Sequence, residues 1–289
     1  MQSITLVKES DATDEDVREA YREIKTALRL PMVSLLFQAY ASTPKFLGLA
    51  WRRLRPSVLA PQFAQQAAAI GAVAERAVAQ WGVGDHAAAL HARSMSAVDL
   101  RRLRDIADLF RLLDPKLLII ARAVDLVLSG ESINGTGSTG PAHEHSYVHN
   151  TKEFRVAPLV LTEERDWPPR VRAIYDEVKS AVTTPFVSND YRALSAYPDW
   201  LEVWWKDTRS LVRDPRYAQV EKDVADAARG AAKALPHRFV MSDELLERNG
   251  IDAARRVELR SANGVFVRTL PGLIINMEIA RRGLGPEPA

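Results

Sequence analysis

An aspartate stands where the sequence's own repeat has leucine. Residues 27–51 align with residues 181–205 when the chain is shifted along itself by 154 residues. In this alignment Asp190 falls on Leu36. If both copies fold alike, the carboxylate occupies surroundings that suit leucine, which is costly unless it is solvated, hydrogen-bonded or protonated. A chain tolerates such a group most readily where it has a chemical task, and a general base is the task that fits a lone carboxylate.

A second exchange of the same kind occurs further along each copy. Pro271 aligns with Pro115 at an offset of 156 residues, which places Asp114 on Leu270. Each half therefore carries one acid where the other keeps leucine, and both acids are candidates for one shared cavity. The alternative is helix capping: aspartate before a proline is typical of an N-cap, and Asp190 could also begin a helix.

The elements that must position these acids are helical. Apolar residues recur at helical spacing, and sustained period-two alternation is lacking. The pattern predicts helices over 17–28, 33–40, 62–81, 96–113 and 116–128, with one more opening at Pro44, and a break between the last two at Pro115. The prediction is an all-α fold of two tandem helical repeats about a pseudo-twofold axis, with a ligand cavity where they meet.

The amino-acid composition marks a linker between the two repeats and limits the classes of function that are expected. Residues 1–128 form the first repeat, residues 129–157 a linker rich in glycine, serine and histidine, and residues 158–289 the second repeat. The 39 basic and 37 acidic residues nearly balance, which gives no indication of nucleic-acid or membrane binding, and cysteine is absent. We expect a cytoplasmic protein that binds a small molecule; a homodimer stays open.

The linker contains two patterns that resemble cofactor sites. Residues 135–140 read G-x-G-x-x-G but follow a helix and precede a proline, so the strand–turn–helix context of a dinucleotide site is missing. His143, His145 and His149 have the side-chain type of metal ligands, yet a flexible loop is a poor scaffold for a metal site. We therefore expect neither a cofactor nor a metal.

Three segments resemble one enzyme family. They are AWRRLRPSVLAPQFAQQAA (50–68), DPKLLII (114–120) and SNDYRALSAYP (188–198), and they look like the group I 2-haloacid dehalogenases, which act on D- and L-2-haloalkanoic acids. The resemblance implies an all-helical pseudo-dimer with its active site between the repeats. It also implies that an aspartate, here Asp190, activates a water that attacks the halogen-bearing carbon directly, with inversion and without a covalent intermediate.

The chain departs from the family's pattern at four positions. The family has asparagine at the position of Asp114, glutamate at that of Gln65, and tryptophan and phenylalanine at those of Met32 and Leu35. Two ionised aspartates facing an anionic substrate would repel it unless one were protonated. The departures therefore concern the substrate pocket more than the fold or the base.

The resulting hypothesis is a cofactor-independent hydrolase acting on a haloacid and water. Asp190 is the expected general base and Asp114 positions or tunes the water. The expected substrate-binding residues are Ser188 and Asn189, with an apolar wall of Met32, Leu35 and Phe37. Two alternatives are a non-catalytic helical protein that binds a small molecule or partner, and a hydrolase of a non-halogenated small acid.

Overall fold

The chain folds into two successive series of helices. The computed structural model describes residues 4–137, 159–182, 184 and 186–285, in which no strand occurs apart from an isolated bridge between Ile133 and Phe239. A 3-10 turn (Glu9–Asp11) precedes the first series, which consists of α1 (Glu15–Leu28), α2 (Leu35–Tyr40), α3 (Pro44–Val58), α4 (Pro61–Val78), α5 (His86–His91) and α6 (Ala97–Leu128).

The second series consists of elements of the same kinds in the same order. After a 3-10 turn (Glu164–Asp166) it consists of α7 (Pro169–Ala181), α8 (Asn189–Leu194), α9 (Pro198–Leu211), α10 (Pro215–Lys233), α11 (Asp243–Arg248) and α12 (Ala253–Gly283). The predicted all-α fold is confirmed. No helix in the described part of the chain is both long and apolar enough to cross a membrane.

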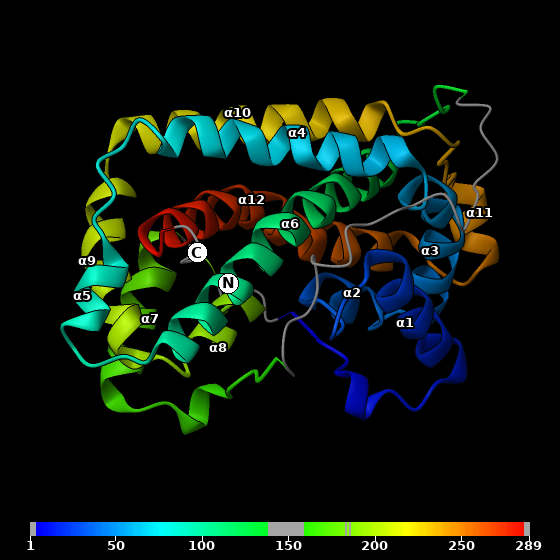
Figure 1. The fold of residues 1–289 in the computed structure, drawn as a ribbon. Coiled ribbons are helices and arrows are strands. Elements are labelled where there is room, and N and C mark those ends of the chain that lie inside the picture. Colours follow the sequence, from blue (N-terminus) through cyan, green and yellow to red (C-terminus); the bar gives the residue numbers. More distant parts are fainter. Residues whose placement is uncertain (1–3, 138–158, 183, 185, 286–289) are drawn as a thin grey trace.

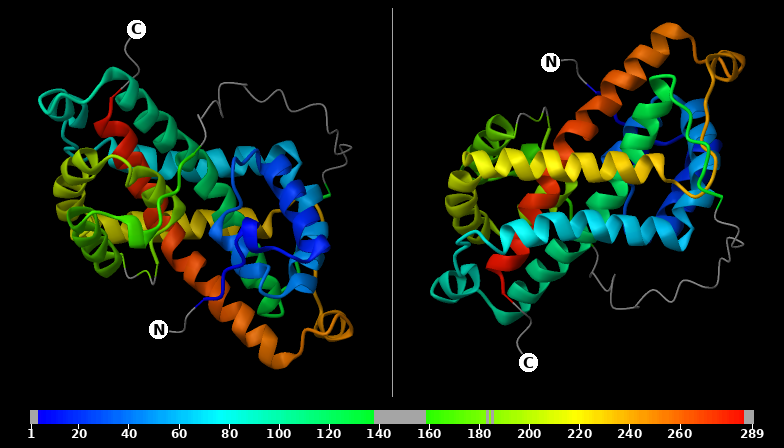
Figure 2. Two further views of the ribbon diagram at one scale, coloured as in Figure 1. Left: turned by 90° about the horizontal axis from the view of Figure 1, so that it is seen from below. Right: turned by 90° about the horizontal axis from the view of Figure 1, so that it is seen from above.

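The two long helices α6 and α12 pack against each other through the centre of the molecule (Figure 1). The helices α4 and α10 lie side by side over them, while α1–α3 and α7–α9 gather at opposite ends (Figures 1 and 2). The two series also exchange contacts, since α2 packs against α12 and α8 against α6. The four elements that carry the candidate residues therefore converge at the centre.

The duplication extends to individual hydrogen bonds. The indole Nε1 of Trp51 donates to Glu23 and that of Trp205 donates to Glu177, both at 2.8 Å. The two donors are repeat counterparts, as are the two acceptors. Each bond joins the third helix of its series to the first. The helices at the two ends of the molecule are therefore held by equivalent contacts.

The predicted helix break at Pro115 is wrong, because α6 runs unbroken through it. Proline removes one backbone hydrogen bond and crowds the preceding turn, but buried residues on either side, such as Leu113 and Leu118, hold the helix together by packing. Pro271 lies inside α12 in the same way. Asp114 is therefore a mid-helix residue, and Ser96 is the N-cap of α6, which excludes capping as the role of Asp114.

A close approach near the end of α12 supports a stability prediction. A Cβ at Gly283 would lie 2.1 Å from Nδ1 of His86, a side chain that is 1% exposed and whose Nε2 lies 3.2 Å from Asp207. Gly283→Ala should therefore lower the unfolding free energy by about 2 kcal/mol, seen as a fall in Tm of about 5 °C. The matched control is Gly230→Ala in α10, where nothing lies within 4 Å and Tm should rise slightly. Equal Tm values for the two variants would contradict the packing of His86 on α12.

Candidate active site

A small cavity lies where α2, α6, α8 and α12 meet. Its free volume is about 40 Å³, and a water needs about 10–15 Å³ by this measure, so the cavity suits a few waters or a very small ligand. Its lining residues are Met32, Ser34, Leu35, Leu36, Phe110, Leu113, Asp114, Leu117, Phe186, Ser188, Asn189, Asp190, Phe266, Thr269, Leu270 and Leu273.

Every residue that lines this cavity has its repeat counterpart in the lining too. The loops and starts of α2 and α8 contribute pairs at an offset of 154 residues, and α6 and α12 contribute pairs at an offset of 156 residues. Leu36 is thus matched by Asp190, and Asp114 by Leu270. The two walls are built from matching sequence positions but differ in polarity, because each has one aspartate where the other has leucine. The polarity of the cavity is therefore asymmetric.

Asp190 is placed in the cavity by the short helix α8, which the backbone of Ser188 begins. The side chain is 2% exposed, and Oδ2 has no hydrogen-bond partner among the described residues. Burial raises the pKa of Asp190 to about 6, while the Ser188 hydroxyl and the backbone N–H groups of Asp190 and Tyr191 limit the rise by favouring the ionised form. Asp190 is therefore largely ionised at neutral pH and close to the pKa that suits a general base.

Asp114 lies on α6 at the same cavity and is 3% exposed. Burial, and then the charge of Asp190, raise the pKa of Asp114 well above its ordinary value. Because the two carboxyl groups line one cavity and the pKa of Asp114 is the one that the other charge raises, Asp114 is the member of the pair that favours the protonated form. The neutral acid can donate a hydrogen bond, which an ionised carboxylate cannot.

Further polar groups of the cavity lack a hydrogen-bond partner among the described residues. Oδ1 of Asn189 accepts from Nη1 of Arg192 at 3.2 Å, and Arg192 is itself held by Glu163 at 2.8 Å. The amide of Asn189 is thereby oriented with Nδ2 free of any hydrogen bond within the described structure, as is Oγ of Ser34. Buried donors without partners are uncommon in proteins, so these groups favour a polar ligand.

A buried hydrogen-bond chain fixes the other side of α8. Tyr175 donates to the carbonyl of Tyr191, whose hydroxyl accepts from Nδ2 of Asn276 at 2.8 Å. Tyr217 in turn donates to Oδ1 of Asn276 at 3.0 Å. The chain joins α8, which carries Asp190, to α7, α10 and α12.

The structure brings most of the sequence-predicted site residues together. Asp114, Asp190, Ser188, Asn189, Met32 and Leu35 all line the cavity, but Phe37 does not. Phe37 instead packs edge-on against Tyr40 and Trp51, with ring centroids 6.2 and 6.1 Å away. Its position two residues after Leu35 on α2 turns it away from Leu35, toward the core of the first series.

Several lining residues were not predicted from the sequence. Phe110 and Leu117 lie four positions before and three positions after Asp114, the spacing that shares a helix face, and Leu113 directly precedes Asp114. Their counterparts Phe266, Thr269 and Leu273 follow from the repeat. Gln65, a position where the chain departs from the family pattern, is exposed on α4 and outside the lining. His143, His145 and His149 lie outside the described residues.

A family model, Halocarboxylic acid dehydrogenase DehI, matches residues 31–191, more than half of the chain. The chain belongs to the DehI family. The match includes both Asp114 and Asp190 and reaches across the linker into the second helical series. In this DehI member both aspartates of the site thus fall inside the matched segment, whereas the lining residues of α12 lie beyond it.

Known proteins resemble this DehI member over nearly its full length. An (R)-2-haloacid dehalogenase of Pseudomonas putida is 26% identical over 267 residues, which cover 91% of this chain and 87% of the relative. Two solved structures of D-2-haloacid dehalogenase, one a mutant with D-2-CPA and one with L-LA, superpose with TM-scores of 0.86 and 0.85. Each is 25% identical and covers 98% of this chain and 96% of its own.

Proposed function

We propose that this protein hydrolyses the carbon–halogen bond of short 2-haloalkanoic acids. The observation that carries the proposal is the pair of buried aspartates in one small, mostly apolar cavity, with one of them ionised near neutral pH. Membership of the DehI family and similarity to an (R)-2-haloacid dehalogenase support the same reaction. The apolar walls suit a short alkyl group and a halide, which form weak contacts.

In the proposed reaction Asp190 is the general base. It takes one proton from a water while the water oxygen attacks C2, and the electron pair of the C2–halogen bond leaves with the halide. The product is the 2-hydroxy acid with inverted configuration, and the proton on Asp190 returns to solvent. No protein atom bonds to the substrate, so no ester intermediate forms.

Asp114 is proposed to stay protonated during this step. No basic side chain occurs among the lining residues, so an anionic substrate must be held by neutral donors. A second ionised carboxylate would repel both the substrate and Asp190. The protonated Asp114 instead positions the water, and Nδ2 of Asn189 holds the substrate carboxylate.

The polar difference between the two walls leads to a stereochemical proposal. The repeat counterpart of Asn189 is Leu35, which has no polar side chain. Only one of the two walls therefore offers an amide donor to the substrate carboxylate. The matched walls could accommodate either enantiomer, as the resemblance to the group acting on D and L acids implies. We propose that the D enantiomer reacts faster, in line with the (R)-acting relative and with the D-2-CPA complex of the solved neighbour.

The direct test is halide release from D- and L-2-chloropropionate, with the configuration of the product determined by chiral chromatography. We expect halide release from the D enantiomer at the higher rate, and product of inverted configuration. Because water attacks C2 directly, a single turnover in H₂¹⁸O should place ¹⁸O in the product and none in the protein. Label in a carboxylate of the protein would overturn the mechanism, and no halide release from either enantiomer would overturn the function.

The activity should depend on pH through the two aspartates. Asp190 is active when ionised, so kcat/KM should rise about tenfold per pH unit below its pKa of about 6 and level off above it. At alkaline pH, Asp114 loses its proton and kcat/KM should fall, because the substrate then faces two negative charges. A stopped assay of halide release across the pH range measures both limbs. A flat profile from pH 4 to 7 would exclude Asp190 as the titrating base.

A further inference from the structure

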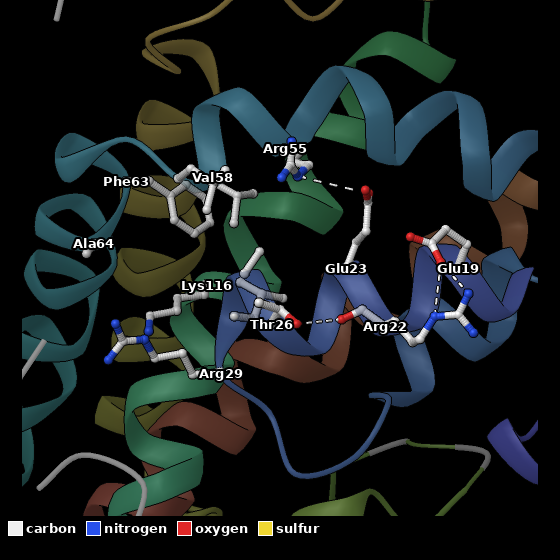
Figure 3. Close-up of a pocket in the computed structure, with 13 residues that line it drawn as sticks. Glu19, Arg22, Glu23, Thr26, Arg29, Arg55, Val58, Phe63, Ala64 and Lys116 are labelled. Carbon is white, nitrogen blue, oxygen red and sulfur yellow. Dashed lines mark hydrogen bonds and ion pairs between the residues drawn. The ribbon is translucent and has the colours of Figure 1, made fainter. Parts of the chain in front are cut away.

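A second pocket, drawn in Figure 3, lies between α1, α3, α4 and α6. Its volume is about 590 Å³, within the range of small-molecule sites, about 300–1,000 Å³. Lys116 lines this pocket, and Asp114, two residues earlier on α6, lines the catalytic cavity. Two residues are roughly 200° apart around a helix, so the pocket lies on the opposite face of α6 from the candidate active site.

The pocket combines an apolar floor with excess positive charge. Leu28, Val58 and Phe63 are buried and form its apolar part, with Ala27, Leu59 and Ala64 beside them. Four basic side chains line it against two acidic ones: Arg22, Arg29, Arg55, Lys116, Glu19 and Glu23. Arg22 pairs with Glu19, and Arg55 lies 4.0 Å from Glu23, so both acids already have cationic neighbours.

Arg29 is the residue that gives the pocket its positive end. Its guanidinium makes no hydrogen bond or ion pair with any residue that the structure describes, and Figure 3 shows it extending to the same end of the pocket as Lys116. Its backbone is left-handed, with φ 56° and ψ 53°, directly after the last residue of α1. Glycine is the residue normally found at such a helix end, because any Cβ is disfavoured there. An arginine is therefore present at a backbone position where glycine, which has no side chain, is energetically preferred.

The charge is specific to the first half of the molecule. The repeat counterpart of Lys116 is Gly272, against which the carboxylate of Glu221 packs: a Cβ there would lie 2.8 Å from Oε1. The matching positions therefore carry a lysine on α6 and, on α12, a glycine against which the carboxylate of Glu221 from α10 packs. As at the candidate active site, the two repeats differ here in a charged side chain, although the packing of the helices does not require this difference.

We propose that this pocket binds a monocarboxylate with an unbranched apolar chain of about six carbons. Its carboxylate contacts Arg29 and Lys116, and its chain lies on Leu28, Val58 and Phe63. Such a ligand pairs the unsatisfied guanidinium and covers the apolar floor together. It is too long for the catalytic cavity of about 40 Å³, so the two sites are distinct.

Calorimetric titration of the full-length protein with hexanoate tests the site. We expect saturable binding at one site, an affinity at least fivefold weaker for the neutral analogue hexanamide, and an unchanged Kd in Asp190→Asn. Arg29→Gly and Lys116→Gln should each weaken hexanoate binding at least fivefold, whereas Arg76→Gln, an exposed arginine of α4 outside the pocket, should not.

Arg29→Gly also separates loss of binding from loss of structure. Glycine suits the left-handed position, so Tm should rise by about 2 °C while hexanoate binding weakens. The proposal is overturned if no saturable binding occurs, if hexanamide binds as well as hexanoate, or if Arg29→Gly and Lys116→Gln keep the native Kd. A Kd that changes in Asp190→Asn would assign the binding to the catalytic cavity and overturn it too. None of these outcomes depends on dehalogenation, so the two proposals can fail separately.

Discussion

Asp190→Asn should lower kcat for halide release from 2-chloropropionate by about 10²–10⁴-fold. The amide has nearly the same shape but cannot accept a proton from water, and a positioned general base contributes about 10²–10⁴-fold. The loss should appear in kcat and kcat/KM alike, because the base acts only in the transition state. Steady-state assay of chloride release at pH 8 measures it.

The stability of the same variant supplies the control. The folded pKa of Asp190 is about 6 against an ordinary value of 3.8, so above pH 6 its ionisation destabilises the native state by about 3 kcal/mol. That penalty vanishes at acid pH, where the carboxyl is protonated in both states. The uncharged amide should therefore leave Tm at pH 8 unchanged or raised. A variant with native Tm and native kcat would rule out Asp190 as the base, and activity lost together with Tm would point to misfolding.

Asp114→Leu should reduce kcat/KM by about 10²-fold, whereas Asp114→Asn should reduce it by tenfold or less. Leucine is the residue at the matching position, Leu270, so it should fit the cavity wall but leave the attacking water without a hydrogen bond. Asparagine keeps a neutral donor in place, as the protonated carboxyl does. Rates for both variants at pH 7, measured beside the native protein, give the comparison.

The pH profile decides whether Asp114 acts through its proton. In Asp114→Asn the alkaline fall in kcat/KM should disappear, because no second carboxyl can ionise, while the acidic limb near pH 6 stays with Asp190. Asp114→Leu should also gain stability above neutral pH, since the native carboxyl must ionise there in an apolar setting. An alkaline limb that persists in Asp114→Asn would assign that titration to another group.

The fold could be predicted because two patterns, the helical spacing of apolar residues and the internal repeat, can be recognised in the sequence itself. Helical spacing of apolar residues fixed the type of nearly every element, and the repeat indicated that the elements come twice. The break at Pro115 was wrong, because the packing that carries a helix through a proline comes from α12, far away in sequence. The short helix α5 was not predicted.

The two acids of the site were predictable because they break the repeat. Asp114 and Asp190 stand out against leucine, but Phe110 and Phe266 are alike in both halves and give no such contrast. Phe37 was misplaced because an apolar residue type does not distinguish a cavity wall from the core. The raised pKa of Asp114 results from burial beside another acid, which no sequence pattern states.

The matched lining of the catalytic cavity limits how such a site can be assembled. If two identical chains met to form it, an acid at one position would be present on both walls, and so would every donor. Joining the two units in one polypeptide lets each wall mutate alone. A single ionised base opposite a single neutral acid is an arrangement that covalent linkage permits and that exact symmetry would forbid.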